Sequence, residues 1–160
     1  MSDQSILKGK KILAVDDEPD VLEVIQENLP DALVTTAGDF DAAVTLIQEQ
    51  SFDLVILDIM GVNGFDLLKA CRKRKFPAAM LTAQSMNVES LNRAIREGAV
   101  SFLPKYDLHT LPEVVAEILE GIEQGKSHWV KLFERLGPYF EKKLGVVWAD
   151  LEKPPFPPGY

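Results

Sequence analysis

The sequence predicts an α/β fold in which a doubly wound, five-stranded parallel sheet carries helices on both faces and is followed by a C-terminal helical extension. Short apolar runs alternate with amphipathic stretches from the start of the chain, as expected for strands joined by crossover helices. The most apolar run, residues 54–57, lacks polar alternation, which is typical of a strand buried on both faces. The length of 160 residues suits one domain and an appendage.

Proline and aspartate residues mark the helix ends of the first two βα units. Residues 11–15 predict the first strand, and Pro19 opens a helix that Pro30 stops. Proline is tolerated in a first helical turn, where its missing N–H costs nothing, but not in a helix interior. Residues 32–36 predict the second strand, and Asp39 can cap the next helix. The apolar side chains of that helix recur at helical spacing, at Phe40, Ala43, Val44 and Ile47.

The third and fourth units follow the same pattern. After the strand of residues 54–57, a helix is expected from Gly64 to about Lys75. Residues 77–81 predict the fourth strand, and a fourth helix ends at Gly98, a residue that suits the left-handed backbone of a helix C-terminus. The apolar face of this fourth helix is formed by Val88, Leu91, Ala94 and Ile95.

The fifth unit completes the domain. Residues 100–103 predict the last strand, and Thr110 and Glu113 have the spacing of a capping box at the start of the last helix. We therefore expect a domain of residues 1–124, followed by a helical and proline-rich extension of residues 125–160.

The extension has an apolar stripe that requires a partner surface. Gly137 and Pro138 interrupt this stripe. Its apolar side chains recur at helical spacing, at Trp129, Leu132, Phe133, Leu136, Phe140 and Leu144. Two interpretations stay open: the segment folds back on its own domain, or it forms a homodimer or docks a partner. The tail, residues 154–160, is expected to be extended or disordered.

Composition narrows the classes of partner and compartment. The net charge of -8 disfavours direct binding to nucleic acids and to anionic lipid surfaces. The single cysteine, Cys71, lies in a helical pattern and is expected to be an ordinary core residue. No apolar stretch approaches the length of a membrane span, and the N-terminus does not resemble a signal peptide, so a cytoplasmic location is expected.

Polar residues follow four of the five predicted strands. These residues are Asp16, Asp17, Asp58, Thr82 and Lys105. In doubly wound sheets, ligands bind outside the carboxyl ends of the strands, so these side chains are expected to converge there. Converging carboxylates repel one another and need a compensating cation, and hard oxygen ligands favour Mg²⁺. The lysine and the threonine hydroxyl complete a set that can bind phosphoryl oxygens.

The same residues, with their neighbours, resemble the receiver domains of two-component response regulators. The resemblance covers roughly residues 10–123 and rests on four motifs at strand ends. These are Ile-Leu-Ala-Val-Asp-Asp-Glu-Pro (12–19), Asp-Leu-Val-Ile-Leu-Asp (53–58), Leu-Thr-Ala (81–83) and Phe-Leu-Pro-Lys (102–105). Each motif alone is weak, but their order and separation make the match specific. The resemblance implies a flavodoxin-like sheet with strand order 2-1-3-4-5.

The resemblance also implies a chemical role for each site residue. Asp58 would be the phosphoacceptor that attacks the phosphohistidine of a sensor histidine kinase or a phosphotransfer protein. Asp17, Asp58 and the main-chain carbonyl of Met60 would hold Mg²⁺, and Asp16 would act on the metal through a water molecule. Lys105 would offset the charge of the transferred phosphoryl group.

Two further sets of residues are implied by the resemblance. The phosphoryl-binding and switch residues would be Thr82, Lys105 and Phe102. Thr82 and Lys105 would bind phosphoryl oxygens, and the ring of Phe102 would turn into the space that Thr82 leaves. This would change the surface formed by the last two helices and the last strand, which binds a downstream protein target. Met60 and Gln84 would tune hydrolysis of the aspartyl phosphate. The chain would not be an enzyme beyond promoting its own phosphorylation and dephosphorylation.

The loop after Asp58 departs from the family pattern. Residues 58–64 are about two residues shorter than the corresponding loop in most receivers and lack its Met-Pro pair. Plainer roles also exist for some residues: Asp16 and Asp17 could cap the helix at Pro19, Lys105 could be a solvated loop lysine, and Phe102 could be a core aromatic.

Three functions compete. A phosphorylation-switched signalling protein is favoured, and a receiver-like adaptor that binds without phosphorylation is the alternative, because the loop after Asp58 is short. A phosphatase of the haloacid-dehalogenase type is disfavoured, because its Asp-x-Asp pattern is absent after the first strand. His109 and His128 stand singly and predict neither a metal site nor a phosphodonor.

Overall fold

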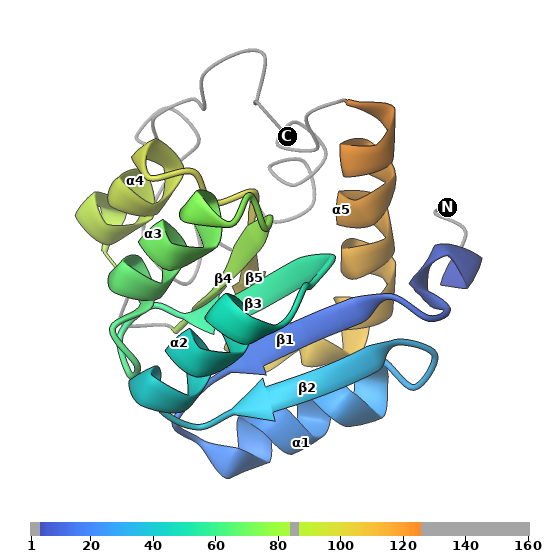
Figure 1. Ribbon diagram of the computed structural model, residues 1–160. Coiled ribbons are helices and arrows are strands. Elements are labelled where there is room, and N and C mark those ends of the chain that lie inside the picture. The colour runs from blue at the N-terminus through green and yellow to red at the C-terminus, as the bar shows by residue number, and fades with distance from the viewer. Residues whose placement is uncertain (1–3, 84–86, 126–160) are drawn as a thin grey trace.

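A computed structural model describes residues 4–83 and 87–125 and shows a three-layer α/β sandwich (Figure 1). Its parallel sheet has the order β2-β1-β3-β4-β5, which confirms the predicted fold and strand order. The strands are β1 Lys11–Val15, β2 Leu33–Ala37, β3 Leu54–Asp58, β4 Ala78–Thr82 and β5 Ser101–Pro104. The α-helices are α1 Pro19–Asn28, α2 Phe40–Glu49, α3 Gly64–Lys73, α4 Val88–Arg96 and α5 Leu111–Gln124. Two 3-10 helices are η1 Gln4–Leu7 and η2 Lys105–Thr110.

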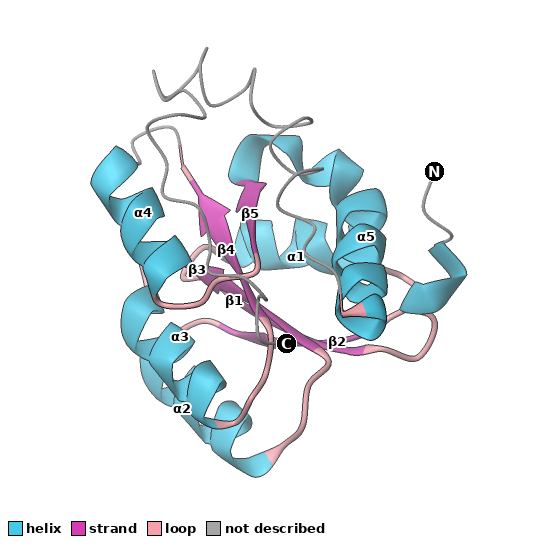
Figure 2. Cartoon of the chain, turned by 90° about the horizontal axis from the view of Figure 1, so that it is seen from above, coloured by secondary structure: helices cyan, strands magenta, loops and turns pink. Residues whose placement is uncertain are grey.

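The sheet separates two hydrophobic cores. Helices α1 and α5 cover one face, and α2, α3 and α4 cover the other (Figure 2). Side chains of β1 alternate between them: Leu13 and Val15 lie in the core under α2–α4, whereas Ile12 and Ala14 lie in the core under α1 and α5. Every residue of β3 is buried, because this strand is in the middle of the sheet and covered on both faces.

Four strands extend one residue beyond their predicted ends. β2, β4 and β5 each begin and end one residue later than predicted, and β3 continues to Asp58. The polar last residues are still paired in the ladder, with Asp58 opposite Leu81 and Thr82 opposite Pro104. Hydrophobicity alone therefore truncates β3 and β4, because their main-chain pairing continues past the last apolar side chain.

Most helix ends agree with the expected local signals. The carboxylate of Asp39 accepts a hydrogen bond from the N–H of Ala42, as an N-cap should. α1 ends at Asn28, just before Pro30, and Gly98 has a φ of +99° after α4. α3 ends two residues before the predicted Lys75, which itself has a left-handed φ of 61°.

The predicted capping box at Thr110 is wrong. The chain between β5 and α5 forms the 3-10 helix η2, so Thr110 has φ −88° and ψ 1° and not the extended backbone that an N-cap requires. Its hydroxyl instead donates to the carbonyl oxygen of Asp107 at 2.9 Å. The N-terminus of α5 therefore begins without a side-chain cap from Thr110.

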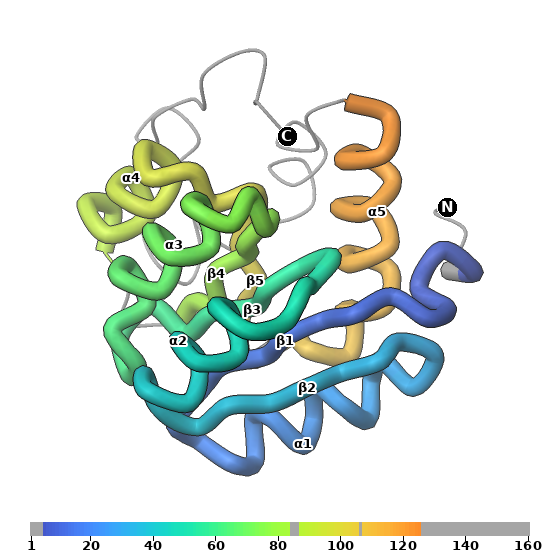
Figure 3. The backbone as a smooth tube through the Cα atoms, viewed as in Figure 1, coloured from blue at the N-terminus to red at the C-terminus, as the bar shows by residue number. Residues whose placement is uncertain are grey.

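The N-terminal 3-10 helix η1 extends the core on one face of the sheet. Its Leu7 is buried with the residues of α1 and α5, and the backbone trace shows η1 lying beside α5 (Figure 3). Lys10, just after η1, forms an exposed ion pair with Glu123 of α5 at 3.3 Å. The two ends of the described chain are therefore held together by apolar packing and one surface ion pair.

Composition predicted that Cys71 is a core residue and that no segment spans a membrane. Cys71 is a free cysteine inside the core, as expected, and burial raises the pKa of its thiol to about 12. Within residues 4–83 and 87–125, the helices are all too short or too polar to cross a membrane. The extension from residue 126 onwards, including its apolar stripe and His128, lies outside the described residues, so neither interpretation of the stripe is tested.

Candidate functional site

Four adjacent strands deliver the predicted site residues to one edge of the sheet. Asp16 and Asp17 follow β1, Asp58 and Thr82 are the last residues of β3 and β4, and Lys105 follows β5. Because β1, β3, β4 and β5 are neighbours in the sheet and run parallel, their carboxyl ends meet at the same edge. The predicted convergence is confirmed for Asp16, Asp58 and Lys105, which are in direct contact.

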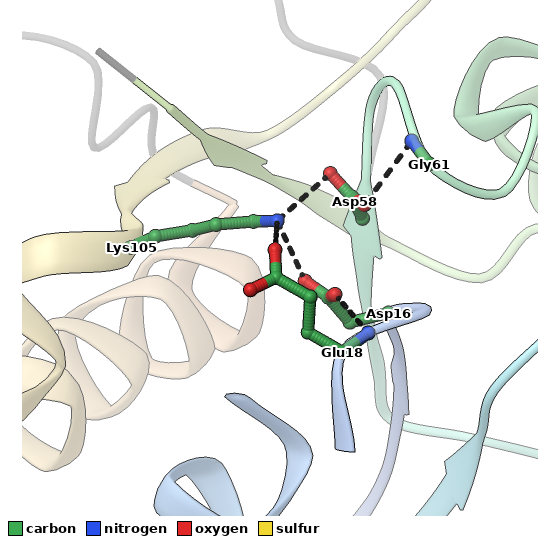
Figure 4. A network of polar contacts seen from close by, with 5 residues as sticks. All are labelled: Asp16, Glu18, Asp58, Gly61 and Lys105. Carbon is green, nitrogen blue, oxygen red and sulfur yellow. Dashed lines mark hydrogen bonds and ion pairs between the residues drawn. The ribbon is translucent and has the colours of Figure 1, made fainter. Parts of the chain in front are cut away.

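Lys105 is the centre of a network of carboxylates (Figure 4). Its Nζ lies 3.0 Å from Oδ2 of Asp16, 3.3 Å from Oδ1 of Asp58 and 3.2 Å from Oε1 of Glu18. The lysine side chain is only 13% exposed, and Asp16 is fully buried. Lys105 is therefore a largely buried counter-charge, and the simpler interpretation as a solvated loop lysine is wrong.

The network shifts the pKa values of Asp16 and Lys105. Burial raises the pKa of Asp16 above its ordinary value, and the charge of Asp58 acts in the same direction, while the Glu18 N–H and Lys105 offset part of the rise. Burial by itself lowers the pKa of Lys105, but the hydrogen bond to Asp16 and the charge of Asp58 outweigh it and raise that pKa. Lys105 therefore stays protonated at physiological pH.

Sequence reasoning missed Glu18. Its side chain reaches Lys105, and its main-chain N–H donates to Oδ1 of Asp16 at 2.8 Å. Asp16 is therefore not the N-cap of α1, because the N-cap residue is Glu18. The Asp16 carboxylate instead stabilises the turn before α1 through this hydrogen bond. The signal available in sequence was the third consecutive acidic residue, which follows the predicted pair directly.

Gly61 is the second residue that sequence reasoning missed. Its main-chain N–H donates to Oδ2 of Asp58 at 3.1 Å, on the opposite side of the carboxylate from Lys105 (Figure 4). A Cβ atom at this position would lie 2.4 Å from Oδ2 of Asp58 and 2.5 Å from Oδ1 of Asp17. Two carboxylate oxygens therefore face a small space that only a glycine leaves open.

The short loop after Asp58 folds tightly over that residue. The N–H of Gly64 donates to the carbonyl oxygen of Ile59 at 3.1 Å, and a Cβ at Gly64 would lie 2.3 Å from the carbonyl oxygen of Asp58. Asn63 has a left-handed φ of 54°, which asparagine tolerates better than most residues. This loop is about two residues shorter than in most receivers. It closes through the close backbone approaches of Gly61 and Gly64 and through the left-handed backbone of Asn63.

The remaining predicted residues have different environments. Thr82 is fully buried, and its hydroxyl has no hydrogen-bond partner among the described residues. Phe102 is also fully buried, in the core under α2–α4. Met60 is 69% exposed and lines a cavity of about 340 Å³ between the loop after β3 and α4. Gln84 lies outside the described residues.

The arrangement fits a small divalent cation. Carboxylate oxygens of Asp16, Asp17 and Glu18 lie within 4.8 Å of one another, and Asp17 and Asp58 both border the space left open at Gly61. These are all hard oxygen donors, which suit Mg²⁺ better than metals that prefer nitrogen or sulfur. His109, by contrast, is 80% exposed and pairs with Asp107 at the surface, as expected for a residue outside the site.

Comparisons with known proteins agree with this geometry. A family model described as "Response regulator receiver domain" matches residues 12–116. The chain is 34% identical over 120 residues to the response regulator protein PilR of Pseudomonas aeruginosa, a match that covers 71% of this chain and 27% of PilR. It is 33% identical over 103 residues to the alkaline phosphatase synthesis transcriptional regulatory protein PhoP of Bacillus subtilis, covering 61% of this chain and 42% of PhoP. The chain thus spans less than half the length of either relative.

A solved structure shows the same similarity in three dimensions. The response regulator receiver domain protein (CheY-like) from Methanospirillum hungatei superposes with a TM-score of 0.67 at 25% identity. The superposition covers 73% of this chain and 98% of that protein. The shared part of the two chains is therefore a whole domain of the solved protein.

Proposed function

The chain belongs to the response regulator receiver domain family, and we propose that Asp58 accepts a phosphoryl group from a phosphohistidine. The donor would be a sensor histidine kinase or a phosphotransfer protein in a two-component system. The phosphorylated chain would then change its contacts with a downstream protein target. In this proposal the protein acts in the cytoplasm and is not an enzyme for other substrates.

The contact between Asp58 and Lys105 carries the proposal. Oδ1 of Asp58 would form a bond to phosphorus, the P–N bond would break, and its electron pair would return to the imidazole nitrogen, which takes a proton from solvent. The ammonium of Lys105, 3.3 Å from Oδ1, would offset the negative charge of the phosphoryl oxygens. Lys105 is positioned for this role before any phosphoryl group arrives.

Mg²⁺ is the cofactor that this site is proposed to use. Asp17, Asp58 and the main-chain carbonyl of Met60 would hold it, and Asp16 would contribute through a water molecule. The bound cation would supply positive charge next to the phosphoryl oxygens. The space left open by Gly61 beside Asp17 and Asp58 supports this assignment.

Thr82 and Phe102 are proposed to convert phosphorylation into a change of surface. A buried hydroxyl without a partner costs about 1–3 kcal/mol, and a phosphoryl oxygen would give that of Thr82 an acceptor. Movement of Thr82 toward the phosphoryl group would leave space for the buried ring of Phe102 to turn. The result is a population shift between two packings of the surface formed by α4, β5 and α5.

The direct test is phosphorylation by a small donor. The protein is incubated with acetyl phosphate, with and without Mg²⁺, and examined by intact and peptide mass spectrometry. We expect one magnesium-dependent phosphoryl group, in the peptide that contains Asp58. A folded protein that takes up no phosphoryl group, and does not bind beryllium fluoride, would instead support the phosphorylation-independent adaptor.

Met60 is predicted to slow hydrolysis of the aspartyl phosphate. It lies two residues after Asp58, where a bulky thioether hinders an attacking water molecule. Met60→Asn should lose phosphate about 10-fold faster, which corresponds to about 1.4 kcal/mol in the barrier. The decay is followed by intact mass after acetyl phosphate is removed. Met60→Leu, which keeps the bulk, serves as the control and should decay at the wild-type rate; an unchanged lifetime in Met60→Asn would contradict the prediction.

A further inference from the structure

We propose that Gly61 is a positioning residue for the phosphoacceptor of this chain. Its main-chain N–H would hold Oδ2 of Asp58, and its lack of a side chain lets the loop approach Asp58 and Asp17 together. This inference rests on the proposed function of Asp58. The positioning role belongs to the main chain of the short loop after Asp58 and not to a side chain.

The two oxygens of Asp58 are held from opposite sides. Oδ2 accepts from the Gly61 N–H at 3.1 Å, and Oδ1 faces the ammonium of Lys105 at 3.3 Å. A carboxylate held at both oxygens has its rotation about the last side-chain bond restricted. Oδ1 therefore stays directed to the place where Lys105 can stabilise a phosphoryl group (Figure 4). Oδ2 stays on the side of Asp17, because a Cβ at Gly61 would lie close to Oδ2 of Asp58 and to Oδ1 of Asp17.

A side chain at position 61 would clash with the carboxylates of Asp58 and Asp17. A Cβ there would meet Oδ2 of Asp58 at 2.4 Å, and Oδ1 and Cγ of Asp17 at 2.5 and 2.8 Å. Separations this short require something to move. The displaced atoms would be the two carboxylates of the site itself, so an alanine would misplace the groups that the reaction uses.

The loop after Asp58 has little freedom to retreat from such a clash. Its far end is fixed by the hydrogen bond from the Gly64 N–H to the Ile59 carbonyl oxygen. Gly64 also approaches the main chain of Asp58 and Ile59 so closely that a Cβ would lie within 2.8 Å of three backbone atoms. Strain introduced at Gly61 is therefore transmitted to the carboxylates and not absorbed by the loop.

The first test compares two glycine-to-alanine variants at the same edge of the sheet. Gly61→Ala should be phosphorylated by acetyl phosphate with Mg²⁺ about 100-fold more slowly, as expected for a displacement on the order of 1 Å in a reacting group. Gly38→Ala is the control, because a Cβ at Gly38 would meet only the Asp16 carbonyl oxygen, at 4.0 Å. It should react at the wild-type rate. A Gly61→Ala protein that reacts as fast as wild type overturns the inference.

A merely structural role for Gly61 is separated from positioning by the melting temperature. Positioning predicts that the rate falls while the melting temperature stays within about 4 °C of wild type, the shift produced by roughly 1 kcal/mol in a domain of this size. The NMR signal of the Met80 methyl group, in the buried core, should also be unchanged. A loss of rate that is accompanied by a cooperative loss of folding overturns positioning in favour of a structural role.

Hydrogen exchange tests the hydrogen bond without changing Gly61. In the metal-free wild-type protein the Gly61 amide should exchange slowly, and Asp58→Ala should remove this protection while the Val55 amide, bonded to the Pro77 carbonyl oxygen in the sheet, stays protected. An unprotected Gly61 amide in a wild-type protein that is phosphorylated overturns this inference alone. A protected amide in a protein that takes up no phosphoryl group overturns the proposed function alone.

Discussion

Replacing Asp58 with asparagine is expected to abolish phosphorylation of the protein by acetyl phosphate in the presence of Mg²⁺. A carboxamide has no anionic oxygen to attack phosphorus, so the barrier cannot be lowered by the charges of Lys105 or of a bound cation. The shape of the side chain is kept, and one negative charge is removed from a buried cluster. The Asp58→Asn protein should therefore fold at least as stably as wild type.

The measurement is intact mass spectrometry over a time course, followed by peptide mapping. Asp41→Asn, a change of the same type in the exposed first turn of α2, is the matched control and should be phosphorylated like wild type. A phosphoryl group that still appears on Asp58→Asn would place the acceptor on another residue, and Asp17 would be the first to examine. Denaturation of both variants establishes that any loss of reaction is not a loss of fold.

Replacing Lys105 with methionine is expected to lower the free energy of unfolding by about 3 kcal/mol in the absence of Mg²⁺. Asp16 is fully buried and Asp58 nearly so, and Lys105 is the cation that contacts both among the described residues. Removing one partner of a buried ion pair leaves an uncompensated charge and typically costs about 3–5 kcal/mol. Methionine keeps most of the aliphatic chain, so the loss reports on the charge.

Urea denaturation of Lys105→Met beside Lys10→Met measures this effect. Lys10 pairs with Glu123 at the surface, where an ion pair contributes about 0–1 kcal/mol, so its variant should be nearly as stable as wild type. Added Mg²⁺ should recover part of the stability of Lys105→Met, because a cation that binds only the folded state stabilises it. Equal stability of the two variants would mean that water, and not Lys105, compensates the carboxylates.

The sheet was predictable because its signals are local. The apolar run of residues 11–15 predicted β1 with the right ends, and Asp39 was identified as the cap of α2 from its position alone. The ends of β3 and β4 were missed by one residue, because Asp58 and Thr82 are polar side chains on extended, paired backbone. Thr110 was misassigned because η2 gives it a backbone conformation that its sequence context does not indicate.

The candidate site was also predicted only in part. Asp16, Asp58 and Lys105 were predicted from their places at strand ends, and the sheet brings these three into contact. Glu18 and Gly61 were missed, because neither has a recognisable role until β1, β3, β4 and β5 form one sheet edge. A glycine in a loop has many uses, and the close approach that requires one here depends on carboxylates from two strands.

The sequence by itself determined the order of strands and helices, the polar residue types at the strand ends and the resemblance to receiver domains. These features depend on hydrophobic periodicity and on the residue at each position, which are properties of short stretches of chain. Only the tertiary structure decided that Lys105 contacts three carboxylates and that the Gly61 N–H donates to Asp58. The contacts of Lys105 join it to residues as distant in sequence as Asp16, and the space at Gly61 lies between carboxylates at the ends of different strands, so both features exist only once the sheet has formed.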